Sequence, residues 1–373
     1  MKVLYSCLSK SWGGLEMFTL TSIQHLIKRN IPVELICSAD SRIHIEANNL
    51  GIMLHPVKAS GYFHPISTFR VSRLLKNNNY SLVHTQASKD LWLLVPALFL
   101  AGVNIPLYLT KQMGSFIIKK DFMHNWLYSR VSKIFAISTA IQNNLIDTTP
   151  VNPKDIIIIP NGTDINKFNP EKVDCRKVRH EFSIASDEIV IGMLARFTPG
   201  KGHEEFLWAA KELNKEYKNL RYLIVGEASM GETKYADNIK KLADEYDLKN
   251  LIFTGYRADT PEIFAALDIF AFPSHSESFG IALVEAMAMK KPAVCSNAEG
   301  VLDIAVNNQT AYLFENKNAS DLKSKLKMLI KSGETRISFG ENARKRVVQN
   351  FDIEIITNKV VNIYREEIRE ASG

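Results

Sequence analysis

The chain has few cysteines, and they are not arranged as metal ligands. Its four cysteines are scattered along 373 residues, and no two of them form a C-x-x-C pair. Closely spaced cysteines are the usual framework of structural zinc sites and of disulfide-stabilised secreted domains. The spacing therefore argues against a zinc site and predicts a reduced, cytoplasmic protein.

Long apolar stretches are also missing. The longest apolar run, Leu91 to Gly102, reads LWLLVPALFLAG and contains Pro96. A helix that crosses a bilayer needs about 20 apolar residues, so this run is too short and is predicted to form a buried helix. The first residues, Met1 to Ser6, enter a predicted strand directly and do not look like a signal peptide. These features agree with a cytoplasmic location.

Neither glycine nor proline is enriched, and there is no low-complexity segment or internal repeat. Hydrophobic residues are 46% of the chain and charged residues 23%, which is typical of a globular protein. A chain of 373 residues is expected to form two domains. Predicted strands alternate with helices, and the alternation is interrupted at the turn Pro160–Asp164 before it restarts at Glu188. We predict an α/β protein with domains at 1–165 and 166–350, and a helix at 351–373 that returns to the first domain.

Positive charge is concentrated in the first half of the chain. Residues 1–160 have 16 Lys or Arg and 8 Asp or Glu, a net charge of +8, whereas the remainder has a net charge of −2. This asymmetry suggests an anionic partner, such as an acidic membrane surface or a phosphorylated substrate, and a generic basic surface is the alternative. The segment Phe116–Tyr128 mixes aromatic residues with Lys119 and Lys120. It is either an interfacial helix that approaches a lipid acceptor or a helix packed on the sheet.

A glycine turn follows the first predicted strand. Gly13, Gly14 and Glu16 precede an amphipathic helix that is predicted from Met17 to Lys28. Strand, turn and helix open a Rossmann-like unit, but GG-x-E is not the G-x-G-x-x-G pattern of dinucleotide sites. Two glycines at a helix start suit a phosphate or a sugar, and a plain tight turn is the alternative.

Further polar residues follow the carboxyl ends of other predicted strands, where ligands bind in open α/β sheets. His84 and Gln86 follow a strand of the first half, although a lone histidine is often a structural residue. In the second half, Arg196, Lys201 and Gly202 lie between a strand and a helix. This turn suits a diphosphate, because Arg can chelate two oxygens and Lys supplies a point charge. The spacing is not that of a Walker A loop, and a surface turn with incidental charges is the alternative.

Two glutamates flank the start of another predicted helix, in PSHSESFGIALVEAMAMKKP. Glu277 lies in the turn, Gly280 begins the helix and Glu285 lies within it. Eight positions on one helix correspond to ~12 Å, whereas glycosidase carboxylates lie roughly 5–9.5 Å apart. The two glutamates therefore fit two ends of an elongated ligand, with phosphate on the helix N–H groups. A capped, half-buried helix with two solvated acids is the alternative.

Taken together, these motifs resemble the retaining glycosyltransferases of family 4, which have the GT-B fold. The resemblance covers essentially the whole chain and depends on Arg196, Lys201, Glu277-x7-Glu285, Gly13-Gly14-x-Glu16 and Asn161-Gly162-x-Asp164. It implies two Rossmann-like domains with a cleft between them, the first binding the acceptor and the second the nucleotide sugar. It also implies sugar transfer from a nucleoside diphosphate donor with retention of the anomeric configuration, without a metal or another cofactor.

The resemblance implies roles for the donor-side residues. Arg196 and Lys201 would hold the diphosphate and stabilise it as a leaving group. Glu277 would contact the donor sugar at the reacting face, and Glu285 would bind the ribose hydroxyls. The remaining donor contacts are backbone groups of Phe279, Gly280 and Ile281, the diphosphate neighbour Gly14, and Tyr256 or Arg257 near the base.

Candidate acceptor or sugar contacts are His84, Gln112 and Glu16. Gln112 stands where many family members have a histidine that reaches the donor sugar. A glutamine side chain is neither an acid nor a base, so the donor phosphate itself would take the acceptor proton.

The sequence thus predicts a glycosyltransferase that uses a nucleoside diphosphate sugar, with UDP favoured and GDP or ADP as alternatives. The expected acceptor is a glycan or lipid-linked glycan of lipopolysaccharide or polysaccharide assembly, reached from a peripheral position on the inner face of the plasma membrane. No nucleic acid partner is expected. The other readings are a nucleotide-sugar epimerase, a phosphorylase of the same architecture, or a non-catalytic sugar-nucleotide-binding protein.

Overall fold

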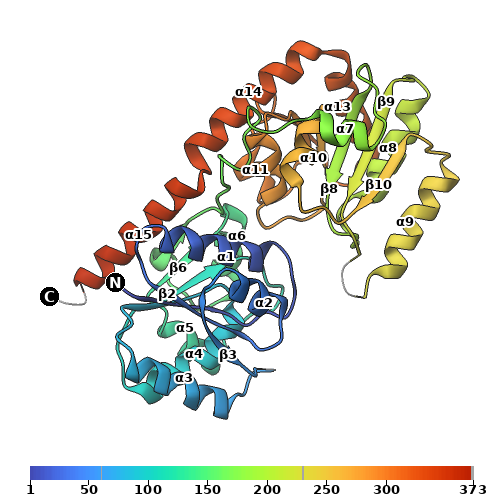
Figure 1. The fold of residues 1–373 in the computed structure, drawn as a ribbon. Helices are drawn as coiled ribbons and strands as arrows, with labels where there is room; N and C mark the ends of the chain where they lie inside the picture. The colour runs from blue at the N-terminus through green and yellow to red at the C-terminus, as the bar shows by residue number, and fades with distance from the viewer. Residues whose placement is uncertain (60, 229–230, 371–373) are drawn as a thin grey trace. The chain divides into compact units, whose positions relative to one another are not determined.

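A computed structural model describes residues 1–59, 61–228 and 231–370 (Figure 1). The chain forms two compact units. Unit 1 consists of Met1–Asn161 and Ile353–Gly373, and unit 2 consists of Gly162–Asp352. Unit 2 is therefore inserted, in sequence, between two segments of unit 1.

Unit 1 is built on a parallel sheet of seven strands in the order β3-β2-β1-β4-β5-β6-β7. Its strands are almost continuously apolar because helices cover a parallel sheet and remove it from water. The strand order reverses between β1 and β4, which creates the crevice where ligands bind in such sheets. The strands are β1 (Val3–Cys7), β2 (Val33–Ser38), β3 (Met53–Val57), β4 (Leu82–Thr85), β5 (Leu107–Lys111), β6 (Lys133–Ala136) and β7 (Ile156–Ile158).

The helices of unit 1 connect these strands, and two short 3-10 turns lie beside them. The helices are α1 (Gly14–Ile27), α2 (Arg42–Asn49), α3 (Pro65–Asn77), α4 (Leu91–Ala101), α5 (Phe122–Ser129), α6 (Thr139–Thr148) and α15 (Ile353–Glu370). The 3-10 turns are η1 (Ser88–Asp90) and η2 (Pro153–Asp155).

Unit 2 repeats the design with six parallel strands in the order β10-β9-β8-β11-β12-β13. The order reverses between β8 and β11, so the second crevice lies there. The two sheets confirm the predicted α/β class with two Rossmann-like halves. The strands are β8 (Ile189–Leu194), β9 (Leu220–Val225), β10 (Leu251–Gly255), β11 (Ile269–Phe272), β12 (Ala293–Ser296) and β13 (Ala311–Phe314). The helices are α7 (Arg176–Glu181), α8 (His203–Asn214), α9 (Thr233–Glu245), α10 (Thr260–Ala266), α11 (Ile281–Ala288), α12 (Val301–Ile304), α13 (Ala319–Lys331) and α14 (Gly333–Asn350).

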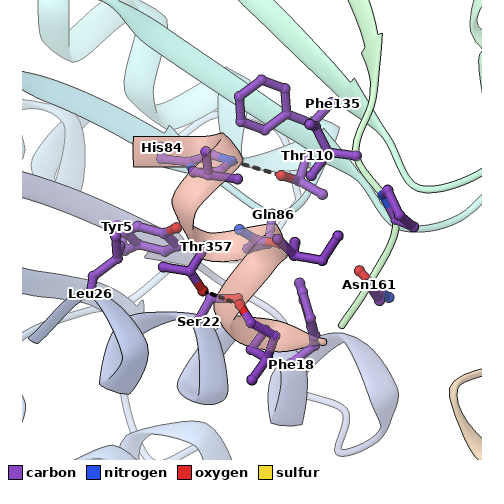
Figure 2. A pocket seen from close by; sticks show the side chains of 15 residues that line it. Tyr5, Phe18, Ser22, Leu26, His84, Gln86, Thr110, Phe135, Asn161 and Thr357 are labelled. Atoms are coloured by element: carbon purple, nitrogen blue, oxygen red, sulfur yellow. Dashed lines mark hydrogen bonds between the residues drawn. The ribbon is translucent and has the colours of Figure 1, made fainter. Parts of the chain in front are cut away.

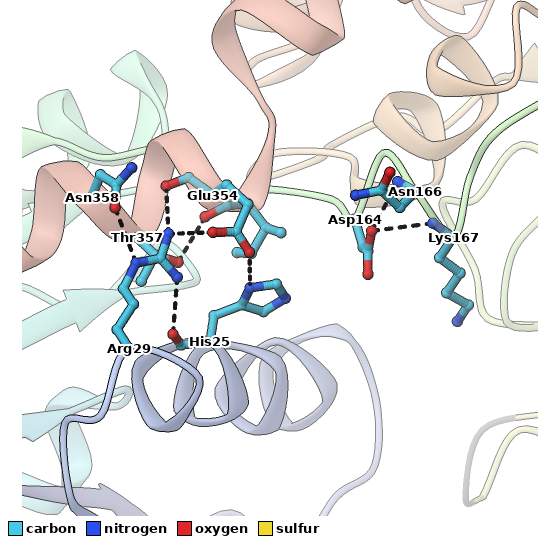
Figure 3. Close-up of polar contacts among 9 residues, drawn as sticks. His25, Arg29, Asp164, Asn166, Lys167, Glu354, Thr357 and Asn358 are labelled. Atoms are coloured by element: carbon cyan, nitrogen blue, oxygen red, sulfur yellow. Dashed lines mark hydrogen bonds and ion pairs between the residues drawn. The ribbon is translucent and has the colours of Figure 1, made fainter.

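Helix α15 belongs to unit 1 and packs beside α1 over the sheet. Its Tyr364 is completely buried, and the ring lies 4.9 Å from that of Tyr108. At the start of the helix, Glu354 forms ion pairs with His25 and Arg29 (Figure 3). Arg29 also donates to the amide oxygen of Asn358 at 3.0 Å and to the backbone oxygen of Glu354 at 3.1 Å. Apolar burial and a polar clamp together hold α15 on unit 1.

Three expectations about the elements need correction. Helix α1 begins at Gly14 rather than Met17, because Gly13 is extended and provides the N-cap. The predicted helix Phe116–Tyr128 is shorter, since the Asp121 side chain accepts from the His124 N–H and starts α5 at Phe122. The apolar run of α4 is only partly buried, because Phe99 and Leu100 are 77% and 60% exposed.

Among the described helices, none combines the length and the apolar character needed to cross a membrane.

Replacing Arg29 with alanine should loosen α15, because this side chain is only 19% exposed and its guanidinium binds both Glu354 and Asn358. We expect the free energy of unfolding of unit 1 to fall by about 1–3 kcal/mol, as for the loss of charged hydrogen bonds. Urea unfolding followed by circular dichroism measures this. Lys28→Ala, at the exposed neighbouring position, is the matched control, and an equal loss in both variants would contradict the proposed clamp.

Candidate functional site

An ion pair joins two loops of unit 2 at the crevice between β8 and β11. The Lys201 ammonium lies 2.7 Å from a carboxylate oxygen of Glu277. Both side chains are partly accessible, 23% and 20% exposed. Lys201 follows β8 and Glu277 follows β11, and these two strands are neighbours in the sheet. The structure thus brings together a cation and a carboxylate that are 76 positions apart in sequence.

Glycine makes this approach possible. Gly202 has a φ of +80°, and a Cβ on it would lie 2.2 Å from the backbone oxygen of Pro273. The His275 N–H donates to the Gly200 oxygen at 2.8 Å, which fixes the same pair of loops. Any larger residue at 202 would have to push the loops apart, because both the conformation and the space require glycine.

The start of α11 presents unused backbone donors beside the ion pair. Gly280 has a φ of +108° and is the N-cap of α11. Among the described residues, no acceptor binds the N–H groups of Phe279, Gly280 or Ile281. The Phe279 side chain is buried and lies 5.9 Å from Phe351, so this residue offers only its backbone. Such groups at a helix N-terminus bind anions.

A second turn supports the Glu277 loop, and sequence reasoning assigned it no role. Glu299 accepts hydrogen bonds from the Ser276 hydroxyl at 2.7 Å and from the Glu277 N–H at 3.0 Å. The Gly300 N–H donates to the Glu277 backbone oxygen at 3.0 Å. The sequence signal that could have revealed this turn is that Asn297–Gly300 is polar and follows β12 at the same edge of the sheet. Glu299 adopts a φ of 41°, a left-handed conformation that costs energy for a non-glycine residue.

Glu285 lies within α11 and is half-buried. Burial raises the pKa of its carboxyl to about 7, and the positive charge of Lys167 partly opposes this shift. No hydrogen bond or ion pair reaches the carboxyl from the described part of the chain. A carboxyl of this kind can both accept and donate hydrogen bonds near neutral pH.

Arg196 follows β8 and is exposed. Its guanidinium has no ion pair or hydrogen bond with any described residue. The backbone around it is fixed, because the Phe197 N–H donates to the Glu227 oxygen at 2.9 Å. A Cβ on Gly226 would lie 2.0 Å from the Ala195 oxygen, so this approach also needs glycine. The result is an exposed cation at a strand end whose backbone is held by hydrogen bonds.

The two residues predicted near a nucleotide base differ in availability. Tyr256 is 48% exposed. The Arg257 guanidinium is bound by Asp259, at 2.8 Å and 2.7 Å, and by Glu181, and these carboxylates raise its pKa. Arg257 therefore fixes the turn after β10 to the end of α7, and a contact with a base does not fit its environment.

The structure places His84 in the core of unit 1, and its predicted role as an acceptor or sugar contact does not fit. The side chain is 2% exposed, and one ring nitrogen bonds to the Tyr364 hydroxyl. The other ring nitrogen bonds to the Thr110 hydroxyl (Figure 2). Burial lowers the pKa of the imidazole to about 3, so it stays neutral. The cavity beside it measures about 30 Å³, room for one or two waters rather than a sugar.

Gln112 is also buried, and neighbouring amides occupy its side chain. It donates to Gln86 at 3.1 Å and accepts from the Asn161 amide at 3.0 Å. Asn161 is the last residue of unit 1 before unit 2. The Gln112 amide therefore fixes the side chain of Asn161 at the point where the chain leaves unit 1.

The glycine turn of unit 1 is more accessible. A Cβ on Gly14 would meet nothing within 4 Å, so its backbone is open to a ligand. Glu16 is 3% exposed, and no described residue forms a hydrogen bond or ion pair with its carboxylate.

The described residues include no group of three or more His, Cys, Asp or Glu side chains placed to hold a metal ion. The candidate site of unit 2 therefore provides two cationic side chains, three backbone N–H donors and two carboxyl groups near one edge of the sheet.

Comparison with known proteins identifies the family. The model of the group 1 glycosyl transferases matches residues 175–346, and the model of Glycosyltransferase Family 4 matches residues 12–167. The capsular polysaccharide biosynthesis glycosyltransferase CapM of Staphylococcus aureus is 23% identical over 94% of each chain. An Escherichia coli UDP-Gal:alpha-D-GlcNAc-diphosphoundecaprenol alpha-1,3-galactosyltransferase is 27% identical over 80% of this chain and 78% of its own.

Solved structures share the fold. A glycosyltransferase of Rickettsia africae aligns with a TM-score of 0.90 at 21% identity, over 98% of each chain. Anabaena HepE, in complex with UDP-glucose, aligns with a TM-score of 0.84 at 23% identity, over 98% of this chain and all of its own. Since the two family models match successive parts of the sequence, the chain belongs to the family 4 retaining glycosyltransferases of the group 1 type, with the GT-B fold.

Proposed function

We propose that this glycosyltransferase moves a sugar from a UDP-sugar to a lipid-linked glycan in bacterial polysaccharide or lipopolysaccharide assembly. The observation that carries the proposal is the Lys201–Glu277 pair beside the unused N–H groups at the start of α11. The name of the E. coli relative specifies a UDP-Gal donor and a diphosphoundecaprenol-linked acceptor, and HepE binds UDP-glucose. These names support the choice of UDP and of a lipid-linked acceptor.

The diphosphate is assigned to the cations at the end of β8. Glu277 holds the Lys201 ammonium at the crevice, so the cation is already oriented when the donor arrives. Arg196 has no partner to give up and can chelate two phosphate oxygens. The N–H groups of Phe279, Gly280 and Ile281 supply neutral donors for the same anion.

The reaction that suits this set is a transfer on one face of the sugar. The bond between the anomeric carbon and the donor phosphate breaks, and the acceptor oxygen bonds to that carbon on the same face. The acceptor proton passes to the departing phosphate oxygen, which leaves UDP and a product of unchanged anomeric configuration. Lys201 and Arg196 stabilise the charge that develops on the phosphate. Glu277 would contact the donor sugar.

The nucleoside is assigned to the remaining groups of this edge. Glu285 would bind the ribose hydroxyls, which fits a carboxyl that can both donate and accept hydrogen bonds. Tyr256 is the better candidate for the base, because Arg257 is bound by two carboxylates. The contact of Gly14 with the diphosphate and the contacts of Glu16 and Gln112 with sugar or acceptor stay predictions.

A thermal-shift series with UDP, GDP and ADP sugars tests the donor. A ligand at a hundred times its Kd should add about 2.7 kcal/mol of stability, and we expect this for a UDP-sugar alone. Incubation with the preferred donor and no acceptor then separates the alternatives. An epimerase would isomerise the sugar, and a phosphorylase would need inorganic phosphate. A protein that binds the donor but transfers nothing to any lipid-linked acceptor would overturn the assignment of catalysis.

Lys201→Ala should lower kcat by about a hundredfold or more, because it removes a charge that stabilises the leaving phosphate. Initial rates with saturating donor give the effect. Lys215→Ala is the control, because Lys215 is an exposed lysine at the C-terminal end of α8. This variant should stay near the wild-type rate. A loss of less than about tenfold in Lys201→Ala would show that this cation does not hold the diphosphate.

The stability of unit 2 should depend on pH through Glu285. Burial favours the protonated carboxyl, so its contribution to folding is fully present below the ordinary pKa of 4.5 and is lost as the pH rises through about 7. Glu285→Gln should therefore lose less thermal stability than the wild type between about pH 5 and pH 8. Glu245→Gln, at an exposed position of α9, is the control and should follow the wild-type curve. Identical curves for all three proteins would refute the shift.

A further inference from the structure

A pocket at the carboxyl edge of the unit 1 sheet takes no part in the site described above. Its volume is about 80 Å³, and exposed side chains such as Lys89 and Tyr62 line it, so it is open to solvent. The pocket lies where η1 follows β4 and where the chain approaches α5. Its walls are formed by Tyr62, Ser88, Lys89, Trp92, Lys119, His124, Leu127 and Tyr128.

A buried lysine lies behind this pocket. Lys111, the last residue of β5, is 7% exposed and donates to the Ser88 hydroxyl at 3.3 Å. No carboxylate of the described residues forms an ion pair with it. Burial, together with a smaller effect of the Lys119 charge, lowers the pKa of its ammonium to about 8. An ammonium kept at this edge with one hydroxyl partner lacks most of the acceptors that its three N–H groups require.

Carboxylates that could neutralise these cations are scarce. Between residues 47 and 147 the sequence has ten Lys or Arg residues and only three acids, Asp90, Asp121 and Asp147. Asp90 is buried and accepts from the hydroxyls of Ser6 and Thr85 and from the Leu8 N–H. Asp121 forms an ion pair with His124. No carboxylate of the described residues, Asp147 included, forms an ion pair with Lys89, Lys111 or Lys119, so these charges are available to an anion.

Large apolar side chains are exposed next to the walls of the pocket. Phe63 follows Tyr62 and is 85% exposed, while Ile118 precedes Lys119 and is 69% exposed. Within the walls, the rings of Tyr62 and Trp92 lie 5.2 Å apart, and Lys89 lies 5.5 Å from the Tyr62 ring. Other exposed apolar residues of the same segments are Ile66, Phe116, Ile117 and Phe122. Exposed apolar side chains beside unpaired cations suit a ligand, or a surface, with a lipid part and an anionic part.

We infer that this pocket binds the diphosphate group of the lipid-linked acceptor, with Lys89 and Lys119 on its oxygens and the exposed apolar residues toward the lipid. In such an acceptor the diphosphate lies between the lipid chain and the glycan. The pocket would hold the diphosphate, and the exposed apolar residues beside the pocket would face the lipid chain. Lys111 supports the charge from behind Ser88. This inference rests on the proposed function, because it takes the acceptor class from there.

Calorimetric titration of the full chain with farnesyl diphosphate, inorganic pyrophosphate and farnesol tests the inference. We expect farnesyl diphosphate to bind more tightly than pyrophosphate, and farnesol not to bind, because both the anion and the chain contribute. Lys119→Met should weaken farnesyl diphosphate binding about tenfold through the loss of charge-assisted hydrogen bonds. Lys120→Met, which removes the same charge one residue outside the pocket, should change it less than about twofold.

A comparison of the two variants and a vesicle-flotation experiment distinguish the ways in which the inference could fail. Equal weakening by Lys119→Met and Lys120→Met, or equal affinities for pyrophosphate and its farnesyl ester, would overturn it. Flotation with phosphatidylglycerol vesicles that is lost in Lys119→Met, without binding of farnesyl diphosphate, would assign the pocket to a membrane headgroup and overturn the acceptor role. The thermal shift with UDP-sugar should be unchanged in both variants. If the wild type shows no such shift, the proposed function fails instead.

Discussion

The contact between the Lys201 ammonium and the Glu277 carboxylate organises the functional edge of unit 2. A partly exposed ion pair adds little to stability, so its importance lies in position. It joins the loop after β8 to the loop after β11, at the point where the strand order reverses. The pair in turn depends on Gly202, which lets one loop touch Pro273 of the other. Glu299 and Gly300 then fix the Glu277 loop from the opposite side. A cation, a carboxylate and three backbone donors are thus held in place before any ligand binds.

The sequence predicted the two sheets because their signals are local. Buried runs such as β8 and the amphipathic helices after them show their periodicity within a few residues, and polar turns mark the strand ends. Lys201 and Glu277 were found for the same reason. The environments of His84 and Arg257 depend instead on distant partners. Tyr364 lies 280 positions from His84, and Glu181 lies 76 positions from Arg257. The early start expected for α5 was an avoidable error, because Asp121 is a local N-cap signal.

The two units use buried polar groups differently. In unit 1, His84, Gln112 and Asp90 are satisfied by side chains or backbone from other parts of the unit, so they stabilise the sheet edge. In unit 2, the half-buried Glu285 has no partner among the described residues, and neither has the exposed Arg196. An unpaired polar group is costly when it is buried, which marks Glu285 as a candidate ligand contact. Within unit 1, Lys111 differs from His84, Gln112 and Asp90, because it is buried with the Ser88 hydroxyl as its one described side-chain partner.

The insertion of unit 2 between two segments of unit 1 has a consequence for biosynthesis. A ribosome makes every residue of unit 2 after β7 and before α15. Tyr364, whose ring packs against those of Tyr108 and Phe135, is therefore made last among the buried core residues of unit 1. Until then the nascent sheet has an uncovered apolar face, while unit 2 already has its complete sequence. Domains generally fold as units during synthesis, so unit 2 can complete its fold while the last segment of unit 1 is still to be made.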